Sequence, residues 1–134
     1  MKLNHIGIVV NDIEKSIKVY RELGYILKSE IHLDNVQNNK LVFLENIITG
    51  ENIELIQSIN EKSTIINSKE GYHHLCYEVK NINQFIDNFN SKKIGIIFTD
   101  KIKAPAFDNR NVIFAYLKNN TIVEFLETED DING

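Results

Sequence analysis

The spacing of apolar residues changes shortly after the start of the chain. Residues 6–10 alternate between apolar and other side chains, as in a strand with one buried face. In residues 13–20 the apolar side chains recur every three to four positions, which is the spacing of one helix face. The pattern therefore predicts a strand that leads directly into a helix.

The same pattern occurs again 69 residues further along the chain. The segment HIGIVVNDIEKSIKVY at 5–20 aligns with HLCYEVKNINQFIDNF at 74–89, and the leading histidine and five apolar positions keep their character. Asp12 and Asn81 precede the two helical stretches and are predicted to cap them. Internal repetition of this kind predicts two similar structural units.

Each copy continues with three strand-like runs of apolar residues. They cover 25–31, 40–44 and 52–57 in the first copy, and 94–99, 111–117 and 121–126 in the second. Both copies thus follow the order βαβββ. Because such a unit has only one apolar face to bury, the two repeats, 4–58 and 73–127, are expected to form a single domain over 1–134.

Two acidic residues lie inside otherwise apolar strands. Glu54 and Glu124 are 70 residues apart and so occupy equivalent positions near the end of each copy. A buried carboxylate is unfavourable without a partner. With His5 and His74 from the first strand of each copy, these glutamates form a candidate site for one divalent metal ion. Imidazole and carboxylate ligands without thiolate suit Zn, Ni, Co, Mn or Fe, so the identity of the ion stays open.

The charge and cysteine content narrow the environment and the partners. The net charge of −4 comes from interspersed acids and bases without a basic stripe, which argues against nucleic-acid binding. The apolar run near the N-terminus is too short for a signal segment or a membrane span. Cys76 is the only cysteine and is interpreted as apolar filling rather than as a nucleophile. A chain without an internal disulfide suits a reducing compartment, so we expect a cytoplasmic protein.

The repeated histidine and glutamate register, together with HIGIVVNDIEKSIKVYRELGY and GYHHLCYEVKNI, resembles the vicinal oxygen chelate superfamily, in particular its glyoxalase I and methylmalonyl-CoA epimerase group. The resemblance implies an α+β, glyoxalase-like fold in which two βαβββ repeats form a cupped mixed sheet around a metal site, often in a homodimer. It implies that His5, Glu54, His74 and Glu124 are the ligands. It also implies proton transfer next to a carbonyl, with the metal stabilising the enolate. Glu124 is the first candidate for the base and Glu54 the second.

Residues around the site leave the substrate open. Glyoxalase I carries an arginine in its first strand that grips glutathione, where this chain has Val9. Methylmalonyl-CoA epimerases carry a further glutamate ahead of the third strand, where this chain has DNVQ at 34–37. Arg110, in the segment 104–111, is the candidate for binding a carboxylate or phosphate of a small-molecule substrate. The expected substrate is an acyl-CoA or the thiol adduct of a 2-oxoaldehyde, as in lactoylglutathione lyase.

Two other functions are found in the same superfamily. An Fe(II) ring-cleaving dioxygenase would use two histidines and one carboxylate, and the fourth ligand argues against it. An antibiotic-binding protein of this fold would do no chemistry and would generally lack the metal ligands. Metal analysis and oxygen uptake with catechols separate these alternatives from an isomerase or lyase.

Overall fold

The computed structural model describes residues 1–128, which form ten strands and two α-helices. The chain divides into two compact units, one of residues 5–73 and one of residues 1–4 together with residues from 74 onward. The predicted α+β class is confirmed. Residues 129–134 of the predicted domain lie outside the described residues, and one domain over 1–134 stays a prediction. Within residues 1–128, neither helix has the length and apolar character needed to cross a membrane.

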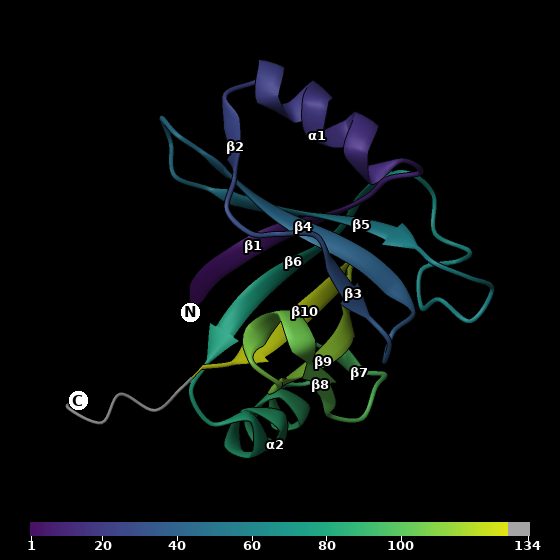
Figure 1. Ribbon diagram of the computed structural model, residues 1–134. Helices are drawn as coiled ribbons and strands as arrows, with labels where there is room; N and C mark the ends of the chain where they lie inside the picture. The colour runs from purple at the N-terminus through teal and green to yellow at the C-terminus, as the bar shows by residue number, and fades with distance from the viewer. Residues whose placement is uncertain (129–134) are drawn as a thin grey trace. The chain divides into compact units, whose positions relative to one another are not determined.

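The unit of residues 5–73 consists of a mixed sheet with a helix on one face. Its elements are the larger part of β1 (Lys2–Val9), then α1 (Ile13–Glu22), β2 (Tyr25–Leu27), β3 (His32–Asp34), β4 (Asn39–Asn46) and β5 (Asn52–Ser58). β5 runs parallel to β1 and antiparallel to β4, and both short strands pair with β4. The helix α1 lies over this sheet (Figure 1) and buries Ile13 and Ile17 against it.

The second unit repeats this arrangement. Its elements are most of β6 (Gly71–Val79), then α2 (Ile82–Lys92), β7 (Gly95–Ile97), β8 (Ile102–Ala104), the 3-10 turn η1 (Pro105–Phe107), β9 (Arg110–Leu117) and β10 (Ile122–Glu127). β10 runs parallel to β6 and antiparallel to β9, while β7 and β8 pair with β9. The helix α2 buries Ile82 and Phe89 against one face of this sheet.

Both helices begin at the predicted caps. The side chain of Asp12 accepts a hydrogen bond from the Lys15 N–H at 3.1 Å, and Asn81 caps α2 in the same way. A second contact holds each helix start to the last strand of its repeat. Gln57 accepts from the first N–H of α1 at 2.8 Å, and Glu127 accepts from the first N–H of α2 at 3.0 Å. Each helix is therefore fixed to the strand that carries the candidate glutamate.

The structure adds a short strand to each predicted repeat. The runs predicted at 25–31 and 94–99 end as strands at Leu27 and Ile97, and β3 and β8 follow after a break. At the break the hydroxyl of Ser29 accepts a hydrogen bond from the N–H of Phe43. In a continuous strand a backbone carbonyl would accept this bond. Thr99 does the same in the second unit. A side-chain acceptor thus ends each run, which apolar periodicity does not reveal.

Candidate metal-binding site

The first candidate pair lies in the unit of residues 5–73. His5 is on β1 and Glu54 is on the parallel neighbour β5, and the His5 Nε2 atom lies 3.4 Å from a Glu54 carboxylate oxygen. Both side chains are buried. The flanking Ile53 and Leu55 pack on the α1 face, so strand alternation turns Glu54 to the opposite face. The Phe43 ring meets the His5 ring edge to face at 5.3 Å.

The second candidate pair has the same construction in the other unit. His74 on β6 and Glu124 on β10 approach to 3.1 Å between Nε2 and a carboxylate oxygen, and both are buried. Their neighbours Val123 and Phe125 pack on the α2 face. The Phe114 ring meets the His74 ring edge to face at 5.7 Å. The repeat seen in the sequence therefore extends to the contacts around each pair.

The four side chains offer donors suited to a metal ion. Each supplies one ligand atom, a histidine nitrogen or a carboxylate oxygen. Burial of a carboxylate costs several kcal/mol unless a counter-charge or hydrogen bonds compensate, and a cation satisfies that need. Nitrogen and oxygen donors without sulfur fit a divalent ion such as Zn, Ni, Co or Mn. Each pair thus supplies donors for part of a coordination shell.

The other residues singled out in the sequence have defined places. Arg110 starts β9 and is half-buried, and its Nε donates to the Phe107 carbonyl at 3.1 Å. Cys76 is fully buried in an apolar cluster with Phe114, consistent with its interpretation as filling. Val9, at the position of the glyoxalase I arginine, is buried in a small apolar cluster. Position 9 therefore has no positively charged side chain that could bind glutathione.

Asp34 has a local structural role. Its carboxylate is buried and accepts hydrogen bonds at 2.9 Å from the backbone N–H groups of Val36 and Gln37. This is the geometry of a turn in which an aspartate replaces a backbone acceptor. The carboxylate therefore stabilises the turn between β3 and β4. The sequence DNVQ at 34–37 alone does not predict this role.

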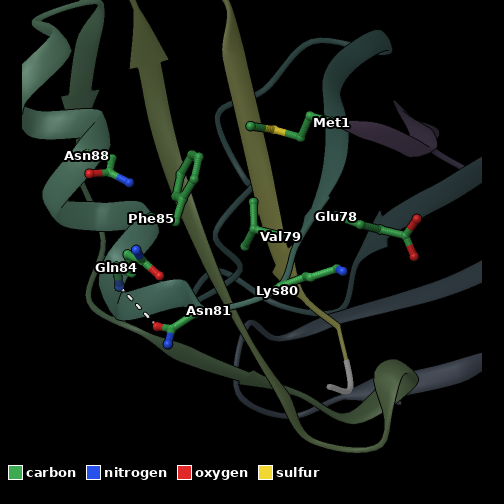
Figure 2. A pocket seen from close by; sticks show the side chains of 8 residues that line it. All are labelled: Met1, Glu78, Val79, Lys80, Asn81, Gln84, Phe85 and Asn88. Carbon is green, nitrogen blue, oxygen red and sulfur yellow. Dashed lines mark hydrogen bonds between the residues drawn. The ribbon is translucent and has the colours of Figure 1, made fainter. Parts of the chain in front are cut away.

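A surface hollow lies at the start of α2. It has a volume of about 440 Å³ and is lined by residues of β6 and α2 and by Met1 (Figure 2). Neither His74 nor Glu124 lines it. Figure 2 shows the capping contact from Asn81 to the helix at its rim. The candidate chemistry therefore lies elsewhere.

A repeated unit with a histidine on its first strand and a glutamate on its last defines a protein of glyoxalase-like fold. The chain belongs to the Glyoxalase/Bleomycin resistance protein/Dioxygenase superfamily, whose family model matches residues 4–114. This confirms the resemblance to the vicinal oxygen chelate superfamily.

Individual relatives place the chain near one group of that superfamily. The mitochondrial methylmalonyl-CoA epimerase of Homo sapiens is 30% identical over 124 residues, which is 88% of this chain and 68% of the relative. A hypothetical protein from Bacillus halodurans C-125 superposes with a TM-score of 0.83 at 26% identity, covering 99% of this chain and 98% of its own. A methylmalonyl-CoA epimerase structure from Mycobacterium tuberculosis, 22% identical, shares the fold with a TM-score of 0.79 over 93% of this chain and 86% of that one. The chain is thus related to epimerase enzymes.

Proposed function

We propose that this chain is a metal-dependent epimerase acting on an acyl-CoA of the methylmalonyl-CoA type. The observation that carries the proposal is the buried histidine–glutamate contact at equivalent positions of both repeats. The mitochondrial methylmalonyl-CoA epimerase of Homo sapiens, at 30% identity, supports the choice of reaction. The reaction would remove the proton from the carbon next to the thioester carbonyl and deliver another proton to the opposite face.

In this proposal His5, Glu54, His74 and Glu124 together hold one divalent ion, and the repeats 4–58 and 73–127 act as one domain. A divalent ion held by these residues would supply positive charge to stabilise the negative charge that develops on the carbonyl oxygen. Zn, Ni, Co and Mn all accept this donor set. The distances of 3.4 and 3.1 Å between Nε2 and the carboxylate oxygen of each pair suit two neighbouring ligand atoms of one ion.

The two carboxylates suit a reaction that removes a proton from one face and delivers a proton to the other. We assign removal of the α-proton on one face to the ionised carboxylate of Glu124, and delivery of a proton on the other face to a protonated carboxyl of Glu54; turnover leaves Glu124 protonated and Glu54 ionised, and proton exchange with water restores both. Arg110 is assigned to the free carboxylate of the substrate, because its planar guanidinium can bind both carboxylate oxygens. Its Nε contact with the Phe107 carbonyl would fix the plane of that group.

Epimerisation is favoured over glutathione-dependent lyase chemistry by the residue at position 9. A buried valine there offers no charge to a glutathione carboxylate. A lyase would therefore need another cation, and methylglyoxal adducts of glutathione are expected to be poor substrates. Oxygen uptake with catechols would favour the dioxygenase, and ligand binding that survives loss of both glutamates would favour the antibiotic-binding alternative.

We further propose a homodimer in the cytoplasm. Exposed apolar residues cluster where Leu23 meets the β4–β5 turn, at Ile47 and Ile48, and Ile47 donates to the Gly24 carbonyl there. Such surface is favourable to bury in a dimer. Light scattering on purified protein would detect it. Fractionation of cells would test the location, since the human relative is named as mitochondrial.

Deuterium exchange tests the proposed reaction. Metal-loaded protein and methylmalonyl-CoA in deuterated water should give one deuterium on the α-carbon. Glu54→Gln and Glu124→Gln should each slow this exchange by about 100-fold or more, because each removes a proton-transfer group. The control Glu45→Gln alters an exposed ion pair with Lys28 and should exchange within about twofold of wild type. Absence of exchange in the wild type would refute the proposal.

A further inference from the structure

An aromatic strip extends from the His74–Glu124 pair to the edge of its sheet. Its members are Phe114 on β9, Tyr116 on β9 and Phe98, which follows β7. The Phe114 ring contacts His74 at 5.7 Å and lies 6.3 Å from Phe98, which stacks on Tyr116 at 4.4 Å. The rings thus form a continuous row that begins at a candidate ligand.

Strand pairing places the strip on the face that carries the pair. Phe114 is directly opposite Glu124, and Tyr116 is two residues further along the same strand. Residues opposite each other on paired strands point to the same face, as do alternate residues of one strand. Phe98 joins this face through its ring contacts and its N–H bond to the Phe114 carbonyl. The far end is open, since Phe98 and Tyr116 are 46% and 45% exposed.

The first repeat has charged side chains at the positions equivalent to Phe98 and Tyr116. Lys28 corresponds to Phe98, because its N–H bonds the Phe43 carbonyl just as Phe98 bonds that of Phe114. Glu45 corresponds to Tyr116, since each pairs with the middle residue of the short edge strand. Lys28 and Glu45 form an ion pair at 3.8 Å, whereas their counterparts stack as rings. The two repeats are therefore alike at the pair and different beyond it.

We propose that the aromatic strip binds the pantetheine arm of the thioester substrate, and so determines which side of the site this arm occupies; this rests on the proposed function. The strip crosses from β10 through β9 to β7, two strand spacings or about 10 Å. An arm leaving the acyl group at the pair is an uncharged chain long enough to follow it. Aromatic faces bind such a chain, whereas the Lys28–Glu45 pair would have to lose water to do so.

The experiment compares two methylmalonyl thioesters that share the reacting group, one of pantetheine and one of the shorter N-acetylcysteamine. The readout is the ratio of their kcat/KM values in the exchange assay. Phe98→Ala should lower the ratio about tenfold, mainly through KM for the longer thioester, because one aromatic contact is lost. Tyr116→Ala should act in the same direction. The matched control Lys28→Ala should keep the ratio within about twofold.

An unchanged ratio in both Phe98→Ala and Tyr116→Ala would overturn the proposal. If these variants also changed from dimer to monomer while the ratio stayed the same, the strip would be covered by a second copy of the chain, and the proposal would again be overturned. If the wild type turns over neither thioester, binding decides, and the exchange assay with methylmalonyl-CoA shows separately whether the proposed function has failed. In that case, about tenfold weaker binding of propionyl-pantetheine to Phe98→Ala in calorimetry supports the strip, and equal binding removes it.

Discussion

Replacing Glu124 by leucine should leave the metal-free protein nearly as stable as the wild type. The carboxylate is buried and one of its oxygens lies 3.1 Å from the His74 Nε2 atom, so its removal loses a buried polar contact of about 1.5–3 kcal/mol. A leucine side chain buried on the same face regains about 1.5–3 kcal/mol. We expect the free energy of unfolding to change by less than about 2 kcal/mol.

The adjacent residue provides the control. Phe125 lies on the same strand but on the α2 face, where its ring is 4.4 Å from that of Phe85. Phe125→Ala should lower the free energy of unfolding by about 3–5 kcal/mol because it opens a cavity. Both variants are measured by urea unfolding in the presence of a chelator. A loss of 3 kcal/mol or more in Glu124→Leu would show that the carboxylate holds the fold together, and would refute the view that it is kept for binding.

Three further substitutions test how the units are built. Gln57→Ala and Glu127→Ala should each lower the free energy of unfolding by about 0.5–2 kcal/mol, since each removes an acceptor from a helix N-terminus. The loss should be larger for Glu127→Ala, because the Glu127 carboxylate also accepts a hydrogen bond from the Asn111 side chain. Urea unfolding measures both variants. Equal losses would contradict a stabilising role for the Asn111 contact. Gly95→Ala should cost about 1–3 kcal/mol, because a Cβ there would lie 2.3 Å from the Tyr116 carbonyl oxygen. If calorimetry gave Gly95→Ala the same unfolding temperature as the wild type, this close packing at Gly95 would be contradicted.

The periodic features of the fold could be predicted from the sequence. The strand-to-helix change, the caps Asp12 and Asn81 and the equivalence of the two repeats all follow from local spacing. The breaks after Leu27 and Ile97 could not be predicted this way, because they depend on hydroxyl groups that accept from a neighbouring strand. Such contacts are set by pairing register, which one strand alone does not encode.

The candidate site shows the same division. The pairing of each histidine with its glutamate was predictable because the repeat keeps both at a near-constant offset. The aromatic strip was missed, although an alignment of Lys28 with Phe98 would have shown a charged position replaced by a ring. The turn contacts of Asp34 could not be predicted from the sequence DNVQ at 34–37, because they appear only in the folded backbone. Differences between the repeats were thus harder to interpret than their similarities.

Metal stoichiometry tests the central proposal that both pairs bind the same ion. Titration of metal-free protein with Co²⁺, followed by calorimetry and visible absorption, should give one ion per chain for the wild type. His5→Ala and His74→Ala come from different repeats, and each should weaken binding by at least about tenfold, because both would remove a ligand of one ion. Two ions per chain, or one ion retained at wild-type affinity in either variant, would contradict a shared site.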